Sequence, residues 1–205
     1  MKVKICGLSK KKEVVFCVNN KTHFCGFILN YPKSHRFVNF NRARELTNIP
    51  RKKTKYVGVL VNPSNKELKK FCLLKLDYIQ LYGNITLNKI KKIKKFTKKK
   101  IIMSLQIKKE KDILRYKLYK KIADIILFDS TGLHKSLEWN YEWIKTVPKN
   151  ITRMIAGNIN INKLDKIKKI ADIVDVSGAM ETNKIKDIQK IKRFLKKIKK
   201  INDKN

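Results

Sequence analysis

The sequence predicts an α/β protein built as a single (β/α)8 TIM barrel, and three observations support this. Short apolar runs recur about every 20 to 30 residues, segments with helical spacing lie between them, and no run is left unpaired. The 205 residues suit one domain and fall at the short end of the range for this barrel. We therefore expect one domain over 1–205, with the last residues, NDKN, frayed.

The apolar runs are short and rich in valine and isoleucine, which favours strands over helices. Most are nearly continuous, as in parallel strands covered on both faces. The predicted strands are VKIC (3–6), HFCGFIL (23–29), KYVGVLV (55–61), DYIQLY (77–82), IIMSLQI (101–107), DIILFD (124–129), TRMIAG (152–157) and DIVDVSG (172–178). An open doubly wound sheet is the alternative, but it usually has a glycine-rich turn after its first strand, and CGLSKKK does not match that turn.

Helical spacing is clearest in three of the intervening segments. LNKIKKIKKF (87–96) and NKLDKIKKI (162–170) repeat an apolar residue every third position. The last segment aligns Ile185, Ile188, Ile191, Leu195, Ile198 and Ile201 on one stripe. We interpret it as a helix that covers the barrel, although peripheral membrane helices share this basic amphipathic pattern.

The chain is strongly basic, with 51 Lys and Arg against 16 Asp and Glu, a formal net charge of +35. Such an excess attracts anions, nucleic acid above all. The lysines, however, fill polar positions of every predicted helix, as in NKIKKIKKF, which is typical of a solvated face. No nucleic-acid-binding motif accompanies them, so we expect no nucleic-acid partner.

Cellular context is predicted from apolar length and from cysteine and histidine spacing. No stretch approaches the roughly 20 apolar residues of a membrane span, and VVFCV (14–18) is too short and too late for a signal peptide. The four cysteines form no CxxC pair and the three histidines are scattered, which argues against a zinc site. We expect a cytoplasmic protein with reduced thiols, no metal and no membrane partner.

In such a barrel the catalytic residues lie where the strands end. Cys6 ends the first predicted strand and Asp129 the sixth. Cationic neighbours can lower the pKa of a thiol, and burial can raise that of a carboxyl. One group would remove a proton and the other deliver one, as in an isomerase that needs no redox cofactor. A buried thiol and a helix cap are the alternative roles of these residues.

Two loops carry the residues expected to bind phosphate, because the loops after strands seven and eight commonly do so in these barrels. Gly157 and Asn158 follow the seventh strand. Ser177, Gly178 and Ala179 follow the eighth and could offer amides and a hydroxyl. Both stretches could also be ordinary turns.

Taken together, the motifs resemble phosphoribosylanthranilate isomerase along the whole chain. The motifs are KICGL (4–8), GFILNYPKSHRFV (26–38), VGVLVN (57–62), DYIQLYG (77–83), ILFDS (126–130), IAGN (155–158) and DIVDVSG (172–178). The N-terminal KICG and the P-x-S-x-R-x-V stretch are the most specific of these, whereas the glycine and DVSG patterns recur in other phosphate barrels.

The resemblance implies an Amadori rearrangement in tryptophan biosynthesis. By that analogy Asp129 is the general acid at the ribose ring oxygen, and Cys6 is the general base at the sugar C2. Arg36 is expected to bind the anthranilate carboxylate, for which its planar guanidinium is suited. Gln80 is expected at the substrate for a different reason, because it lies near the end of the fourth predicted strand. The partner would be a small phosphorylated molecule, and the resemblance leaves monomer and homodimer both open.

The chain departs from the family pattern at five places. His35 stands where a proline is usual, Tyr82 replaces the histidine of QLHG, and Asn158 replaces the second glycine of AGGL. STGLHKSLEWN (130–140) lacks the usual glycine-rich stretch, and SGAME replaces SSGVE. Two other functions stay open at this point: another phosphate-sugar barrel enzyme, and a basic nucleic-acid-binding barrel without catalysis.

Overall fold

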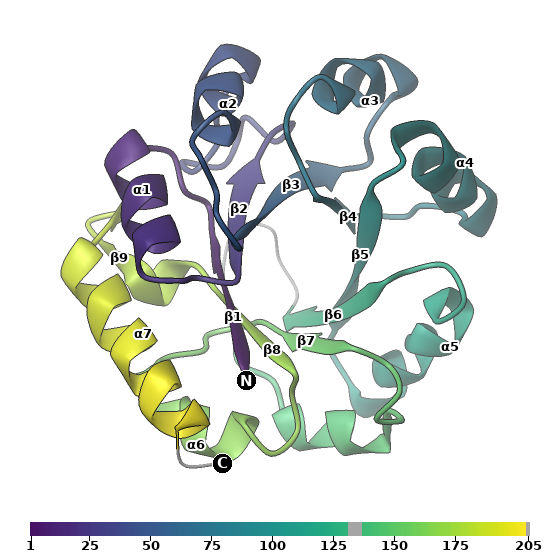
Figure 1. Ribbon diagram of the computed structural model, residues 1–205. Coiled ribbons are helices and arrows are strands. Elements are labelled where there is room, and N and C mark those ends of the chain that lie inside the picture. Colours follow the sequence, from purple (N-terminus) through teal and green to yellow (C-terminus); the bar gives the residue numbers. More distant parts are fainter. Residues whose placement is uncertain (131–136, 204–205) are drawn as a thin grey trace.

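A computed structural model, which describes residues 1–130 and 137–203, shows a closed barrel of eight parallel strands inside a ring of helices (Figure 1). The strands are β1 (Lys2–Cys6), β2 (Phe24–Ile28), β3 (Lys55–Val61), β4 (Tyr78–Tyr82), β5 (Lys100–Ile107), β6 (Ile125–Ser130), β7 (Arg153–Ile155) and β8 (Ile173–Val176). All eight predicted strands are confirmed. Pairing of β1 with both β2 and β8 closes the ring and excludes the open sheet.

Helical segments of unequal length connect the strands. The α-helices are α1 (Lys11–Asn19), α2 (Phe40–Thr47), α3 (Asn65–Cys72), α4 (Leu87–Thr97), α5 (Tyr116–Tyr119), α6 (Leu164–Ile167) and α7 (Ile188–Asn202). The 3-10 helices are η1 (Glu110–Arg115), η2 (Tyr141–Thr146), η3 (Ile161–Lys163) and η4 (Gly178–Met180). The predicted alternation therefore holds, but the connections after β5, β6 and β7 carry only short or 3-10 helices in the described residues.

The alternation of side chains along each strand divides the core into two clusters. One set points outward beneath the helices, as Val3 and Ile5 of β1 do. The other set fills the barrel interior: Phe24, Val57, Ile102, Ile125, Leu127, Met154, Ala156 and Ile173. These interior side chains pack beneath the C-terminal ends of the strands, where active sites of such barrels lie.

The C-terminal segment differs from its predicted single helix. Ile185 lies in a short hairpin of β9 (Glu181–Thr182) and β10 (Ile185–Lys186) and is half-exposed. The helix begins only at Ile188, because Asp187 caps it by accepting from the amides of Gln189 and Lys190. Phe194, which the predicted stripe omits, is buried with Ile191, Ile198 and Ile201.

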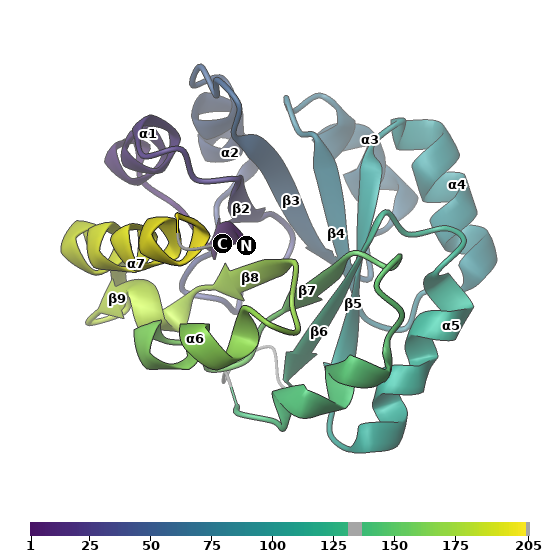
Figure 2. The ribbon, with the colours of Figure 1, turned by 60° about the horizontal axis from the view of Figure 1, so that its bottom comes forward.

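The N-terminus lies against the end of α7, and Figures 1 and 2 show α7 beside β1. The amino group of Met1 donates to Oδ1 of Asn202 at 2.6 Å, and the Asn202 amide donates back to the Met1 carbonyl. Asn202, predicted to fray with the tail, is thus the last residue of α7, whereas residues 204–205 lie outside the described part.

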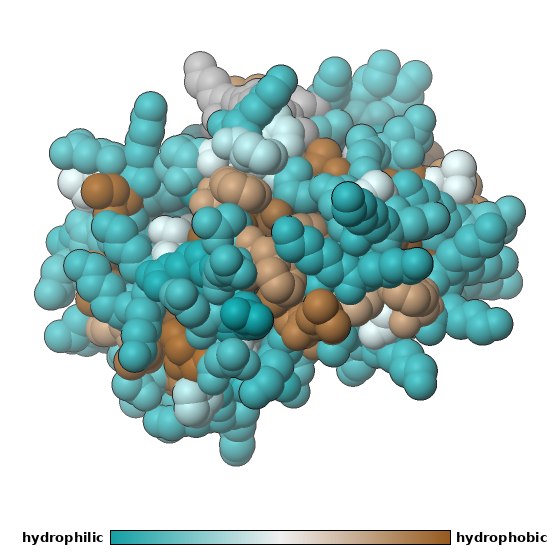
Figure 3. Space-filling model, turned by 90° about the horizontal axis from the view of Figure 1, so that it is seen from above, coloured by the Kyte–Doolittle hydropathy of each residue, from teal (hydrophilic) through white to brown (hydrophobic). Residues whose placement is uncertain are grey.

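Exposed lysines occur in segments all along the described chain rather than in one segment. The face seen in Figure 3 is mainly hydrophilic, with apolar side chains in small groups. Among the described residues, no helix has both the length and the apolar character needed to cross a membrane.

Candidate active site

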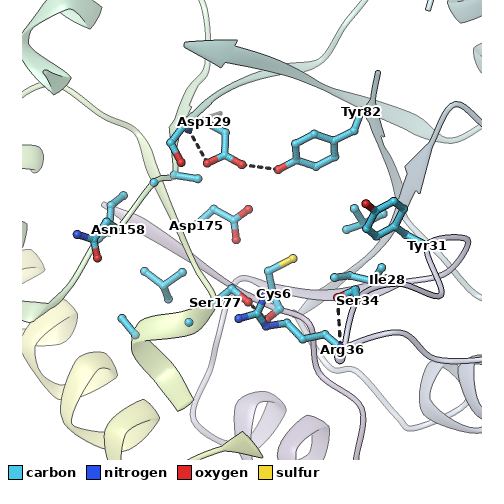
Figure 4. Close-up of a pocket in the computed structure, with 18 of the residues that line it drawn as sticks. Cys6, Ile28, Tyr31, Ser34, Arg36, Tyr82, Asp129, Asn158, Asp175 and Ser177 are labelled. Carbon is cyan, nitrogen blue, oxygen red and sulfur yellow. Dashed lines mark hydrogen bonds between the residues drawn. The ribbon is translucent and has the colours of Figure 1, made fainter. Parts of the chain in front are cut away.

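A cavity of about 220 Å³ opens at the C-terminal mouth of the barrel (Figure 4). Cys6, Arg36, Asp129, Gly157, Asn158, Ser177, Gly178 and Ala179 all line it. Tyr31, Ser34, Tyr82, Gln106 and Asp175 add polar groups to the wall. The structure thus brings together eight of the nine predicted site residues, the exception being Gln80.

Gln80 lies deeper than expected. It is fully buried in β4, and neither its amide nitrogen nor its oxygen has a hydrogen-bond partner among the described residues. The strand continues past Gln80 for two residues, so Tyr82, which points to the same side, reaches the mouth instead. The correction concerns depth: Gln80 lies below the cavity rather than in its wall.

Cys6 places its sulfur between the two sides of the cavity, facing the carboxylates in Figure 4. The residue is 9% exposed. Burial raises the pKa of its thiol above the ordinary value, while Lys4 acts in the opposite direction through its charge and a hydrogen bond. This thiol is therefore shielded from bulk water but open to a small molecule in the cavity.

Asp129 faces the same space from β6. Its Oδ2 accepts a hydrogen bond of 2.7 Å from the phenol of Tyr82, and its Oδ1 accepts from the amide of Ser130 at 2.8 Å. Burial raises the pKa of Asp129 to about 6, even though the Tyr82 hydrogen bond favours the carboxylate. A group that titrates there can hold and release a proton near neutral pH.

An ion pair lies in the barrel beneath the thiol. Nζ of Lys4 is 2.7 Å from Oδ2 of Asp175, and the Lys4 side chain is fully buried. Neither residue was a site candidate in the sequence. The available signal was a lysine and an aspartate within buried strands, each at a position whose side chain points inward.

Arg36 reaches the cavity from the loop after β2. Its Nε and Nη2 donate to the two carboxylate oxygens of Glu181 at 2.6 and 2.8 Å. Lys186 also pairs with Glu181 and donates to the carbonyl and hydroxyl of Ser177. His35, which replaces the usual proline, contacts Glu181 as well, at 3.2 Å. Glu181 therefore holds three basic side chains at one wall of the site.

Gly7 explains the Cys-Gly step that ends the first strand. Its φ is +76°, a conformation that favours glycine, and a Cβ built there would lie 2.4 Å from Cδ of Arg36. The arginine stem thus crosses directly over the backbone next to Cys6. Glycine at this position lets the thiol and the guanidinium share one cavity.

The loops after β7 and β8 form adjacent parts of the wall, in keeping with their expected position. Asn158 has a φ of +47°, so it keeps a left-handed backbone where the family pattern has glycine. The Ser177 hydroxyl donates to the Cys6 carbonyl at 3.0 Å. That bond ties the loop after β8 to the end of β1 and occupies the hydroxyl proton that was expected to meet phosphate.

Two further features of the site are its possible metal ligands and the segment STGLHKSLEWN (130–140). In residues 1–130 and 137–203, no group of three or more His, Cys, Asp or Glu side chains is arranged to hold a metal ion. The departure in STGLHKSLEWN falls mainly on 131–136, outside the described residues. From its described end, Trp139 donates to the Ala156 carbonyl at 2.9 Å and so packs against the loop after β7.

Comparison with known proteins agrees with this geometry. The family model described as N-(5'phosphoribosyl)anthranilate (PRA) isomerase matches residues 3–197. The N-(5'-phosphoribosyl)anthranilate isomerase of Thermoanaerobacter sp. (strain X514) is 33% identical over 172 residues, which covers 80% of each chain. That of Streptococcus mutans is 34% identical over 159 residues, 77% of each.

A solved structure is similar over nearly its whole length. It is a phosphoribosyl anthranilate isomerase in complex with reduced 1-(o-carboxyphenylamino)-1-deoxyribulose 5-phosphate. It superposes with a TM-score of 0.85 at 25% identity, covering 98% of this chain and 99% of that one. On the family match, these relatives and the closed barrel, this chain belongs to the N-(5'-phosphoribosyl)anthranilate isomerase family.

Proposed function

We propose that this cavity converts N-(5-phosphoribosyl)anthranilate into 1-(2-carboxyphenylamino)-1-deoxyribulose 5-phosphate, with Cys6 as general base and Asp129 as general acid. The reaction is the third step from chorismate in tryptophan biosynthesis. The observation that carries the assignment is that a thiol and a carboxyl from two strands that are not neighbours in the barrel, β1 and β6, line one cavity. Family membership supplies the reaction class.

The reaction requires one proton to be delivered and one to be removed. Asp129 protonates the ribose ring oxygen, the C1–O bond breaks, and the anthranilate nitrogen shares its lone pair to form a protonated imine. The Cys6 thiolate then takes the proton from C2, and the C–H electrons form the C1–C2 double bond of an enolamine. Ketonisation of the enolamine gives the product, so electrons are redistributed within the substrate and no external oxidant is consumed.

The two pKa values define when the site is active. The productive form pairs a thiolate with a protonated carboxyl, although burial raises the pKa of Cys6 and that of Asp129 is only about 6. At a pH between the pKa of Asp129 and that of Cys6, a constant minor fraction of the protein has the thiolate and the protonated carboxyl together. This fraction declines below the pKa of Asp129 and above that of Cys6. A bell-shaped profile is expected, with its low-pH limb near 6 set by Asp129.

The ends of the substrate match the chemistry of the two walls. Arg36 presents a guanidinium with five N–H donors, of which Glu181 takes two, and others can meet the anthranilate carboxylate. We assign the phosphate at the other end to the loops that contain Gly157 and Gly178, because both residues line the same cavity and such loops commonly bind phosphate in these barrels. The cytoplasmic location follows as a proposal from the four free thiols.

Turnover of synthetic N-(5-phosphoribosyl)anthranilate, followed through the spectrum of the aromatic amine, tests the assignment. We expect Cys6→Ala and Asp129→Asn each to lose at least about 100-fold in kcat with an unchanged circular dichroism spectrum. Cys72→Ala, which removes a partly exposed thiol outside the cavity, is the matched control and should retain activity. Near-normal turnover in either site variant would contradict the assigned roles.

A growth experiment tests the function independently of the roles. The gene should restore growth without tryptophan to a host that lacks the isomerase, and the Asp129→Asn gene should not. Failure of the unmodified gene, with the protein present in soluble form, would argue against the proposed reaction.

A further inference from the structure

The ion pair of Lys4 and Asp175, of which Asp175 lines the cavity, is a charged group that the proton transfers above do not use. Lys4 lies two residues before Cys6 on β1, so both side chains point into the barrel. The Lys4 side chain is fully buried, and burying an ammonium is unfavourable unless something compensates it. Strand packing alone would be served by an apolar residue at this position.

Asp175 provides that compensation from the neighbouring strand. The register of β1 and β8 pairs Lys4 with Asp175, and the ammonium lies 2.7 Å from Oδ2. Burial by itself lowers the pKa of Lys4, but Asp175 and Cys6 outweigh it and raise the value to about 12. Lys4 is therefore a permanent positive charge within the barrel.

Gly26, which has no side chain, leaves room for the Lys4 ammonium to lie close to the Cys6 sulfur. It stands beside Cys6 in the register of β1 and β2. A Cβ built on Gly26 would lie 3.0 Å from the Cys6 sulfur, 3.0 Å from Cε of Lys4 and 3.2 Å from its Nζ. The thiol and the ammonium thus occupy the space beside one glycine, and any larger side chain would compete with both.

We propose that Lys4 is a positioning residue for catalysis, whose ammonium stabilises the thiolate form of Cys6 while Asp175 holds that ammonium in place. The proposal rests on the role of Cys6 as the base. It assigns opposite effects to the two members of one ion pair: the lysine charge favours the thiolate, and the aspartate charge opposes it. The directions of their effects on the pKa of Cys6 agree, since Lys4 lowers it and Asp175 raises it.

Other charged and titratable groups also face the sulfur. They are Lys186 of β10, Arg36 of the loop after β2, Tyr82 of β4 and Asp129 of β6. Lys186 and Arg36 are both paired with Glu181, which offsets their charge. Among the cations, Lys4 lowers the pKa of the Cys6 thiol the most, both through its charge and through a hydrogen bond.

The rate of alkylation of Cys6 by iodoacetamide, measured from pH 6 to 11 in the full chain by mass spectrometry of its peptide, tests the proposal without substrate. A Cys72→Ala background removes the partly exposed thiol, while Cys17 and Cys25 are fully buried. We expect Lys4→Gln to raise the apparent pKa of Cys6 and slow alkylation at pH 8 by about tenfold, the effect of one pKa unit. Asp175→Asn should lower the pKa and speed alkylation.

The opposite signs distinguish an electrostatic role from a structural one. Both variants break the same ion pair, so mere loosening of the barrel would change alkylation in the same direction in both. Shifts of equal sign, or no shift in Lys4→Gln, would overturn the proposal. Lys4→Arg, which keeps the charge, should lie closer to the unmodified protein.

A double variant covers the case in which Lys4→Gln does not fold because Asp175 is left buried without a partner. Lys4→Gln combined with Asp175→Asn replaces the ion pair by two neutral amides. Its Cys6 pKa should be higher than that of Asp175→Asn alone, because only the lysine charge differs, and equal values would count against Lys4. Inactivity of Cys6→Ala concerns the proposed function, whereas these alkylation rates concern Lys4 only.

Discussion

Tyr82 donates a hydrogen bond of 2.7 Å from its phenol to the Asp129 carboxylate, in the position where the family pattern has histidine. Both residues line the cavity, and Figure 4 shows the bond running across its upper side. The bond stabilises the ionised form of Asp129, whereas burial favours the protonated form and outweighs it. This departure from the family pattern therefore acts directly on the proposed general acid.

Tyr82→Phe should move the low-pH limb of the activity profile upward. Loss of the phenol removes a stabilising hydrogen bond from the carboxylate, so the pKa of Asp129 should rise above 6 by about one unit. The measurement is kcat/KM from pH 5 to 9. Tyr78→Phe, at the other end of β4 and outside the cavity, is the control and should leave the limb in place.

Asp129→Asn should stabilise the protein at alkaline pH although it abolishes turnover. The folded-state pKa of Asp129, about 6, exceeds its ordinary 3.8, so ionising this carboxyl destabilises the native state. That cost is absent below pH 3.8 and complete above pH 6. The variant should therefore gain on the order of 3 kcal/mol at pH 8 and little at pH 4. Urea unfolding at the two pH values measures it, and an equal gain at both would contradict the explanation.

Gly7→Ala should weaken both the fold and the binding of substrate. The added methyl group meets Cδ of Arg36, and alanine disfavours a φ of +76°. We expect a loss of about 1 to 3 kcal/mol in the free energy of unfolding and a rise in KM as Arg36 is displaced. For the free energy of unfolding, Gly178→Ala is the matched control, because its Cβ would lie 3.5 Å from the Arg36 guanidinium, an ordinary contact. Equal losses of unfolding free energy in the two variants would show that Arg36 is not what Gly7 accommodates.

Glu181→Gln should reduce the stability of the fold at neutral pH. It should also make stability depend less on pH in the acid range. Burial alone raises the pKa of Glu181, but the hydrogen bond from Arg36 and the charge of Lys186 lower it to about 2. Its contribution is therefore complete above the ordinary value of 4.5 and is lost as the pH falls towards 2. Removing one partner of a buried pair costs about 3 kcal/mol. Thermal melts between pH 2 and 7 should show this loss shrinking as the solution becomes more acidic.

Most strands of the barrel could be predicted from the sequence, because a buried parallel strand appears there as a continuous run of apolar residues. Cys6 and Asp129 were found at strand ends for the same reason, since one rule about strand order places both at the mouth. Ile185 shows where local pattern misled: its spacing fits the helical stripe, yet the Asp187 cap starts the helix after it. Gln80 shows a second limit, since its direction follows from alternation but its depth depends on where the strand stops.

By itself, the sequence determined the order of the strands, the mouth at which the chemistry lies and the two groups that face each other there. Only the tertiary structure decided their electrostatic setting. Lys4 meets Asp175 across 171 residues of chain, and Arg36 meets Glu181 across 145. Those pairings depend on barrel closure and on the register between strands, which bring charges together at distances that no local pattern of residues records.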